Sequence, residues 1–227
     1  MVQMYMRLLA IGDIHGCCSA LTALWGAVKP ADGDTVVFLG DYVDRGPESR
    51  EVLELMAAES RKSNRVFLRG NHEVMMLDAL ENPFQAESWR ECGGLETLMS
   101  YGITPGKDWA SKIPETHWRF VQATVRYHET PRHIFVHGCL EPHLNLDRQM
   151  DDVLYWQTFD QLLPHKSGKK VVCGHTTHED GDIEDVGHGV CIDTAIAYGG
   201  WLSCLDVESG DFWQATQKGE VRRGKID

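Results

Sequence analysis

The 227-residue sequence lacks several features that would assign it to a special class of protein. No stretch approaches the roughly 20 consecutive apolar residues of a membrane span, which predicts a soluble protein with no membrane partner. The apolar run in "MVQMYMRLLAIGD" is too short for a signal peptide, and cleavage there would remove a polar motif that begins near Asp13. No internal repeat or low-complexity block occurs, so a repeat array is not expected either.

The sequence also lacks a CxxC pair and a surplus of positive charge. Its seven cysteines are an odd number scattered along the chain, so reduced thiols in a cytoplasmic protein are expected rather than a disulfide framework. The chain has 22 Lys and Arg against 34 Asp and Glu, for a net charge of −12. Because such a chain repels a long polyanion, a nucleic acid is not expected as its partner. A pair of bound cations would offset part of this negative charge.

The length and the 42% hydrophobic content are enough for one sizeable core. We therefore expect a single domain over residues 1–227, with its core at about 5–215. The tail over 216–227, which contains "KGEVRRGKID", is polar and is expected to be frayed.

The first third of the chain alternates strand and helix signals. The apolar runs "MRLLAIGD", "DTVVFLGD" and "NRVFLRGN" predict buried strands, and "LTALWGAV", "SREVLELMAAES" and "EVMMLDAL" have helical spacing. Three strand–helix units in succession predict a parallel sheet covered by helices. The residues predicted to form the apolar helix faces are Leu21, Leu24 and Val28; Val52, Leu55 and Met56; and Met75, Met76 and Leu80.

The rest of the chain changes character twice. Residues 82–128 are predicted to be mostly helical, with breaks at Gly93–Gly94 and at "YGITPGKDW". The runs "RHIFVHG", "KKVVCGH" and "HGVCIDT" then predict further short strands, and "GGWLSCLDVESGDFWQAT" predicts a closing hairpin.

Five of the predicted strands end in a polar cluster at the carboxyl end: GDIHG, GDYVDRG, RGNHE, VHG and CGHT. In an open α/β sheet the carboxyl ends of the strands open on one crevice, where ligands bind. The five clusters are therefore expected to converge in space. The candidate metal ligands that they contain are Asp13, His15, Asp41, Asn71, His137 and His175.

This mixture of carboxylate, amide and imidazole ligands suits borderline divalent metals, with Mn preferred and Fe or Zn as alternatives. A carboxylate has enough lone pairs to hold two cations, and Asp41 is the expected bridge. A water between two cations loses a proton readily and can attack phosphorus. The first metal is expected to bind Asp13, His15 and Asp41, and the second Asp41, Asn71, His137 and His175.

Three more residues of the same motifs fit a phosphate-ester reaction. The leaving alkoxide needs a proton, which His72 of "GNHE" could give, while Asp44 of "GDYVDRG" orients the ring and raises its pKa. Arg45 offers a planar fork for phosphate oxygens.

The ordered set "GDIHG", "GDYVDRG", "GNHE", "VHG" and "GHT" with "IDT" resembles the metallophosphoesterase superfamily over about residues 7–207. It resembles most the PPP-type serine/threonine protein phosphatases, in the short form found in bacteria and bacteriophage lambda. The resemblance implies an α/β fold, a calcineurin-like sandwich of two mixed β-sheets with flanking helices. It also implies two metal ions on the six ligands, His72 with Asp44 as the acid pair, Arg45 as a phosphate contact, and a phosphoprotein or phosphopeptide substrate.

One departure from the family concerns a second phosphate-binding arginine. Family members usually carry it in the region that matches "VLYWQTFD", where this chain has Thr158. Either Arg132 or Arg148 substitutes for it, or the phosphate is held less tightly. The longer C-terminal elements of eukaryotic members are absent too, and "IDTAIAYGG" stands in their place.

Two other functions compete with phosphoprotein hydrolysis. A diadenosine tetraphosphate hydrolase shares the fold, but such enzymes tend to have alanine in place of Asp44 and GNHD in place of "GNHE". A non-catalytic scaffold would be expected to lose ligands or the acid histidine, and this chain retains them.

Several conspicuous residues are predicted to have structural roles only. Glu73 is expected to brace the following helix, Arg69 to support its loop, and Cys17 to pack as a buried thiol. His178 is expected to be a solvated loop residue. Most of the seven tryptophans are expected to be packing residues.

Overall fold

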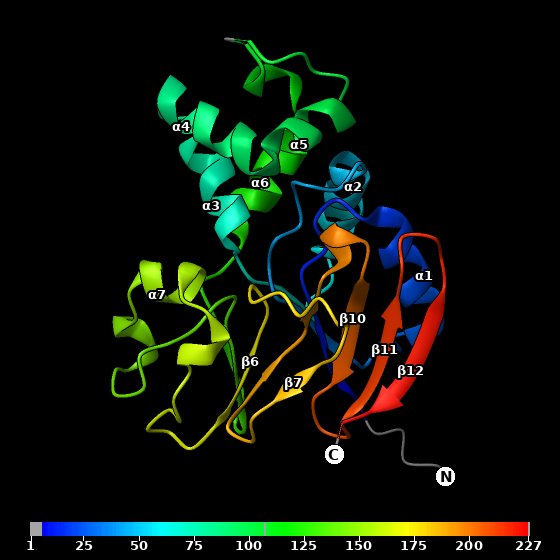
Figure 1. Ribbon diagram of the computed structural model, residues 1–227, viewed down its shortest axis with the longest axis vertical. Helices are drawn as coiled ribbons and strands as arrows, with labels where there is room; N and C mark the ends of the chain where they lie inside the picture. The colour runs from blue at the N-terminus through cyan, green and yellow to red at the C-terminus, as the bar shows by residue number, and fades with distance from the viewer. Residues whose placement is uncertain (1–5, 107, 227) are drawn as a thin grey trace.

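Two β-sheets face each other, with helices on their outer faces (Figure 1). The fold is taken from a computed structural model that describes residues 6–106 and 108–226. The first residue of the expected core, Tyr5, and Lys107 in the predicted break lie outside the described residues. The strands of the first sheet, in spatial order, are β12 (Val221–Lys225), β11 (Asp211–Ala215), β10 (Trp201–Asp206), β1 (Leu8–Ile11), β2 (Thr35–Phe38) and β3 (Arg65–Phe67), with β9 (Asp193–Thr194) beside β10. Those of the second are β4 (His128–Glu129), β5 (His133–Phe135), β6 (Lys170–Cys173), β8 (Gly189–Cys191) and β7 (Glu184–Asp185).

Both sheets are mixed, each with a run of parallel strands beside antiparallel ones. Strands β1, β2 and β3 are parallel, as the strand–helix alternation predicts, and α1 (Cys18–Val28) and α2 (Ser49–Glu59) connect them. In the second sheet β5, β6 and β8 are parallel, while β4 and β7 pair antiparallel. These two mixed sheets with flanking helices confirm the calcineurin-like sandwich expected from the resemblance.

The space between the sheets is filled by apolar side chains from the inner face of each. Side chains there are fully or almost fully buried, because the strands alternate inward and outward residues on a pleated surface. This dry interior holds the two sets of strand ends at a fixed spacing. Its buried members are Ala10, Val37, Leu39, Leu68 and Leu205 from the first sheet and Phe135, Val172, Val190 and Ile192 from the second.

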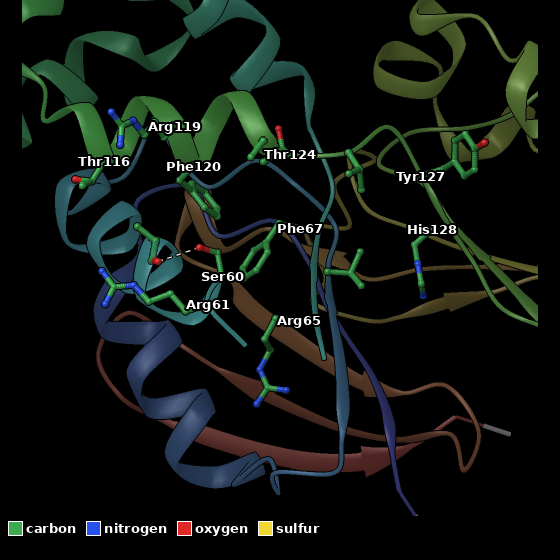
Figure 2. Close-up of a pocket in the computed structure, with 14 residues that line it drawn as sticks. Ser60, Arg61, Arg65, Phe67, Thr116, Arg119, Phe120, Thr124, Tyr127 and His128 are labelled. Atoms are coloured by element: carbon green, nitrogen blue, oxygen red, sulfur yellow. Dashed lines mark hydrogen bonds between the residues drawn. The ribbon is translucent and has the colours of Figure 1, made fainter. Parts of the chain in front are cut away.

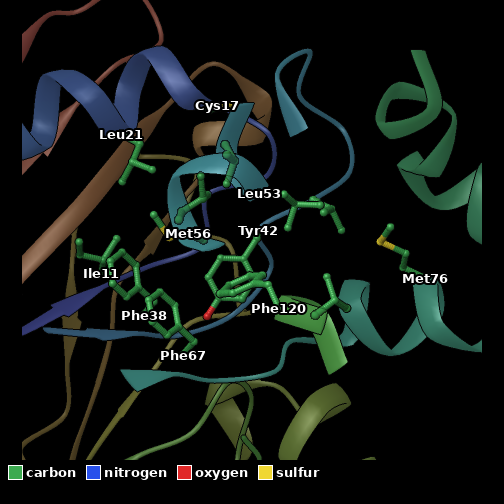
Figure 3. Packing of buried hydrophobic residues seen from close by; sticks show 14 of the residues in the cluster. Ile11, Cys17, Leu21, Phe38, Tyr42, Leu53, Met56, Phe67, Met76 and Phe120 are labelled. Carbon is green, nitrogen blue, oxygen red and sulfur yellow. The ribbon is translucent and has the colours of Figure 1, made fainter. Parts of the chain in front are cut away.

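A larger core lies between the outer face of the first sheet and the helices (Figure 3). The predicted face of α1 is buried there, and α2 contributes Val52 and Met56. Leu53 completes the α2 face, whereas Leu55 is 40% exposed, so the prediction for Leu55 was wrong. Leu80 is likewise 43% exposed, because it lies beyond the end of α3 (Asn71–Asp78).

A helical segment follows β3 and projects above the sandwich (Figure 1). It contains α3, α4 (Pro83–Trp89), a π-helical turn (Arg90–Gly94), α5 (Leu95–Ser100), a 3₁₀ turn (Ala110–Lys112) and α6 (Glu115–Ala123). The predicted break at Gly93–Gly94 is confirmed, because Gly93 has φ 116° and kinks the chain inside the π-helical turn.

The outer face of the second sheet is covered by α7 (Asp151–Trp156). Short 3₁₀ turns flank it at Leu146–Arg148 and Phe159–Gln161, and another lies at Ile196–Tyr198. The expectation of a frayed tail was wrong, because Val221–Lys225 pairs with β11 in antiparallel register as β12. Among the described residues, no helix combines the length and apolar character needed to cross a membrane.

Candidate metal centre

The polar clusters predicted from the sequence lie at the carboxyl ends of the central strands. Asp13 and His15 follow β1, Asp41 follows β2, and Asn71 begins α3 just after β3. From the second sheet, His137 follows β5 and His175 follows β6. The first four and His137 are no more than 4% exposed, and His175 is partly buried.

Asp41 is shared by two groups of side chains that could each hold an ion. One group is His15, Asp41 and His72, and the other is Asp41, His137 and His175; within each group the ligand atoms lie within 4.8 Å of one another. A carboxylate common to both groups occupies the bridging position that the sequence predicts for Asp41. The structure thus joins ligands from both sheets at one rim.

Three imidazoles are each fixed by a backbone carbonyl that accepts a hydrogen bond from one ring nitrogen. That bond sets the tautomer and leaves a lone pair on the other nitrogen, as metal-ligating histidines require. The acceptors are Val43 O for His15 Nδ1 (3.1 Å), Leu39 O for His137 Nδ1 (2.9 Å) and Trp156 O for His175 Nε2 (3.2 Å).

The remaining lone pairs point at one another. Asn71 Oδ1 lies 2.9 Å from His137 Nε2 and 3.2 Å from His175 Nδ1, and Asp41 Oδ1 lies 3.5 Å from His137 Nε2. Acceptors facing acceptors in a buried site are unfavourable unless a cation lies among them. The donor set therefore fits a divalent metal at the predicted second position.

At the predicted position of the first metal, beside His15 and Asp41, a cationic side chain faces the candidate ligands. Arg45 Nη1 donates to His15 Nε2 at 2.9 Å, while Asp41 Oδ2 lies 3.4 Å from the same nitrogen. The guanidinium thus supplies positive charge where the free nitrogen of His15 and the carboxylate of Asp41 meet. Burial lowers the pKa of His15 to about 3, so the imidazole is neutral and available as a ligand at neutral pH.

Asp13 lies in the same region but outside the two groups. Its Oδ2 accepts from the backbone N–H of His175 at 3.0 Å. Burial raises the pKa of Asp13, and the nearby carboxylates of Asp193 and Asp41 raise it further. Three buried carboxylates this close together need positive charge, which supports a cation beside Asp13. Its ligation of the first metal stays a prediction.

The backbone around these residues is strained. His15, Asp41, Asp44, Arg45 and His175 have φ between 44° and 74°, in the left-handed region that side chains seldom adopt. Such angles persist only where the surrounding fold imposes them, and they gather at functional sites.

The proton-donor pair predicted from the sequence is formed. His72 Nδ1 donates to Asp44 Oδ2 at 2.7 Å, and both side chains are buried. His72 Nε2 has no hydrogen-bond partner among the described residues and lies 4.0 Å from Asp41 Oδ2. Burial alone would lower the pKa of His72, but the charge of Asp41 and the bond to Asp44 outweigh it and raise the pKa.

Residues 6–193 match the family model of calcineurin-like phosphoesterases. The chain belongs to this family. The asymmetrical bis(5′-nucleosyl)-tetraphosphatase PrpE of Geobacillus sp. (strain WCH70) is 27% identical, over 88% of this chain and 90% of that protein. Serine/threonine-protein phosphatase 1 of Salmonella typhimurium (strain LT2) is 34% identical, over 47% of this chain and 42% of that protein. The crystal structure of a putative diadenosine tetraphosphatase has 21% identity, a TM-score of 0.64, and coverage of 99% of this chain and 96% of its own.

This calcineurin-like phosphoesterase holds Asp44 with two residues that sequence reasoning treated as packing or overlooked. Trp89 Nε1 donates to Asp44 Oδ2 at 2.9 Å, and Thr97 Oγ1 donates to Asp44 Oδ1 at 2.7 Å. Both come from the helical segment, 45 and 53 residues further along the chain, so no local motif could have pointed to them.

The structural role predicted for Glu73 is confirmed. Its carboxylate accepts from the backbone N–H groups of Asp41 (2.8 Å), Tyr42 (2.8 Å) and Gly70 (2.9 Å). These three bonds fasten the β2 loop to the start of α3. Burial and the charge of Asp41 raise the pKa of Glu73 to about 7.

Arg69 supports its loop as predicted, and Cys17 is a buried thiol. Arg69 Nε donates to Thr124 Oγ1 at 3.0 Å and Nη2 to Gln122 O at 2.9 Å. His178 is not the solvated residue expected, since it is partly buried and lies 3.3 Å from Glu184.

Neither of the two arginines that the sequence suggested as a second phosphate contact lies near the candidate metal ligands. Arg132 pairs with Glu208, which comes just after β10. Because β10 runs antiparallel to β1, Glu208 lies beside the start of β1, whereas the candidate ligands follow the end of β1. The side chain of Arg148 is 79% exposed beside Asp147. Arg45 is therefore the arginine that the described residues place against the ligands.

The ligand set fits two divalent cations, on Asp41 with His15 and on Asp41 with Asn71, His137 and His175. When bound there, such ions supply Lewis acidity, which lowers the pKa of water and neutralises charge on phosphate oxygens. Beside these positions the protein places the guanidinium of Arg45 and, at His72, an imidazole that could donate a proton.

Proposed function

We propose that this calcineurin-like phosphoesterase hydrolyses phosphate monoesters on the hydroxyl side chains of proteins. The observation that carries the proposal is the buried pair of His72 and Asp44 beside the metal ligands. A serine or threonine alkoxide is a poor leaving group that must be protonated as it departs. A donor whose pKa is raised, and whose second nitrogen is unbonded, fits that task.

The protein groups divide the work by position. Arg45 can present two N–H groups to phosphate oxygens, as a planar guanidinium does in bidentate contacts. His72 can give its Nε2 proton to the leaving oxygen while Asp44 keeps the ring oriented. Two divalent cations, with Mn²⁺ preferred for the mixed nitrogen and oxygen ligands, complete the proposed site.

A dinucleoside tetraphosphate is the second candidate substrate. It is favoured by the similarity to PrpE, which extends over most of both chains, whereas the similarity to the Salmonella phosphatase covers about half of each. A nucleotide leaves as a phosphate of low basicity, so its departure depends much less on a proton donor. The phosphopeptide substrate and the cytoplasmic location remain predictions from the sequence.

The test is a turnover panel with the Mn²⁺-loaded protein. Phosphoserine, phosphothreonine and phosphotyrosine peptides are compared with diadenosine tetraphosphate, using the unmodified chain and the His72→Asn variant. We expect a higher kcat/KM for a phosphopeptide, and a larger loss with His72→Asn for phosphoserine than for the dinucleotide. A tenfold or greater preference for diadenosine tetraphosphate would replace the first candidate by the second.

A further inference from the structure

A groove outside the metal centre lies where the edge strands β3 and β4 meet helices α2 and α6 (Figure 2). Its volume is about 650 Å³, within the range of about 300–1,000 Å³ usual for binding sites. Phe67 and Phe120 form its floor, with ring centroids 5.2 Å apart. Val66, Ala123 and Val125 add apolar wall, and Val125 is 43% exposed.

The charge of this groove is opposite to that of the whole protein. Among the described residues, its lining includes Arg61, Arg65 and Arg119 but no Asp or Glu, although the chain has 34 acidic and 22 basic residues. Arg61 is exposed and forms no ion pair within the described ranges 6–106 and 108–226. Arg119 pairs with Glu115, and such an exposed pair is weak. The groove is thus apolar at its floor and positive at its rim.

Arg65 contributes less to this charge than the other two. Its Nε donates to Glu59 at 3.1 Å, and its guanidinium lies over the ring of Trp25. An anionic ligand would therefore be attracted mainly by Arg61, just after the end of α2, and by Arg119 on α6. Figure 2 shows these two side chains on the same side of the aromatic floor.

The groove also contains an open backbone edge. Strand β3 ends the first sheet: β2 pairs with it on one side, and on the other side Val125 covers its far end, where it forms a bridge with Leu68. On its outer side, Arg65 N–H and Phe67 C=O have partners, whereas Phe67 N–H and Arg65 C=O have none among the hydrogen bonds of the described residues. An extended peptide that pairs with a sheet edge uses such groups.

We propose that this groove binds an extended acidic peptide, with one large apolar residue against Phe67 and Phe120 and carboxylates near Arg61 and Arg119. Charge complementarity selects an acidic peptide over a basic one, since the rim repels cations. The free N–H of Phe67 and C=O of Arg65 select an extended backbone. This docking does not depend on which phosphate ester is hydrolysed.

The experiment is a selection from a displayed random heptapeptide library on the immobilised full chain. We expect enrichment of peptides in which Asp or Glu flanks a large apolar residue. The most enriched peptide is then synthesised with a fluorophore, and its Kd is measured by anisotropy. The double variant Arg61→Glu/Arg119→Glu should weaken binding about tenfold or more, because it reverses both rim charges.

The matched control is Arg148→Glu, which makes the same charge change at an exposed position outside the groove. It should alter the Kd less than twofold, and all variants should retain the far-UV spectrum and p-nitrophenyl phosphate turnover of the unmodified chain. Bound peptide should also slow hydrogen exchange at the amide of Phe67. Enrichment without acidic residues, binding that survives the double variant, or displacement of the peptide by AMP would overturn the proposal.

Discussion

The histidines of the centre differ in what bonds their second nitrogen. His15, His137 and His175 each donate to a backbone carbonyl, which leaves a neutral ring with one lone pair. His72 donates to the carboxylate of Asp44 instead, which favours its protonated form. The same side chain is therefore suited to ligating a metal in three places and to donating a proton in one.

The His72→Asn variant should retain its metal and lose most of its turnover. The substitution removes the proton donor, whose contribution is typically about 10²–10⁴-fold in rate. Metal analysis should show both ions still bound, while kcat for a phosphoserine peptide falls by about that factor. Empty metal positions in this variant would mean that His72 is a ligand rather than the acid.

The Trp89→Phe variant tests the support of Asp44. Phenylalanine keeps most of the packing but removes the N–H that shares Asp44 Oδ2 with His72. Loss of a hydrogen bond to a charged group is worth about 1.5–3 kcal/mol, so kcat should fall by about 10- to 100-fold with little change in KM. Because Asp44 becomes more basic, the pKa of His72 should rise and the alkaline limb of the pH–rate profile should move to higher pH. If the alkaline limb stays at the same pH, Trp89 does not act on the pKa of His72 and has a packing role instead.

At the residue scale, the sequence predicted the candidate site residues that lie in local motifs and missed the residues that lie outside them. The candidate ligands and the residues of the proposed acid pair could be picked out because they adjoin glycines at strand ends, in runs that can be read locally, and the structure places them together. Trp89 and Thr97 were missed, since each reaches Asp44 from a distant segment with no motif of its own. Asp193 belongs to the quoted "IDT" motif but was assigned no role, although its charge raises the pKa of Asp13.

Among the elements, strands and most helix-face residues followed from periodicity, and the errors concern two helix-face residues and the last strand. Leu55 and Leu80 satisfy helical spacing in the sequence, but one lies beside the buried stripe of α2 and the other past the end of α3. The polar sequence of β12 hid a strand because an edge strand with mostly exposed side chains has no apolar pattern. The strand β11 was predicted as part of the closing hairpin, but its pairing with β12 is visible only in the structure.

Asp34 joins the start of β1 to the loop before β2, and its effect should depend on pH. Its carboxylate accepts from Arg7 N (2.9 Å), Arg7 Nη2 (2.6 Å) and Ala31 N (2.8 Å). Burial opposes the charge, but these bonds lower the pKa of Asp34 below its usual value. The stabilisation is therefore full above the unfolded pKa of about 3.8 and is lost as the pH falls through the lower folded pKa.

Asp34→Asn should accordingly lower the free energy of unfolding by about 1–3 kcal/mol at neutral pH. The difference from the unmodified chain should narrow as the pH drops below about 3.8. Urea unfolding at several pH values measures this. A difference that stays constant over the whole range would show that the carboxylate charge plays no part.

For the molecule as a whole, the decisive feature is that two sheets share one metal centre. Asp41 comes from the first sheet, and His137 and His175 come from the second. The convergence of strand ends and the two-sheet fold were predictable from the ordered motifs. The substrate was not, because relatives of both substrate classes carry this fold.

Binding of divalent metal should stabilise the whole fold, because the ions would link the two sheets. At a concentration 100 times its Kd, each cation stabilises by about 2.7 kcal/mol. For a chain of this size, that raises the Tm by about 5–10 °C. Calorimetry of the chelator-treated protein with and without Mn²⁺ measures the shift.

Two variants make this measurement specific. Asp41→Asn should abolish the Mn²⁺-dependent shift, because it weakens both metal positions at once. Asp34→Asn lies away from the centre and should leave the shift unchanged, although its baseline Tm is lower. No shift in the unmodified protein would contradict a binuclear centre.

The two residues that bond to Asp44 come from a different part of the fold than the candidate metal ligands. The cation ligands belong to loops of the sandwich and the start of α3, whereas Trp89 and Thr97 belong to the helices inserted between β3 and β4. Substitutions in those helices could therefore change the acidity of the His72 and Asp44 pair without moving the loops that carry the candidate metal ligands.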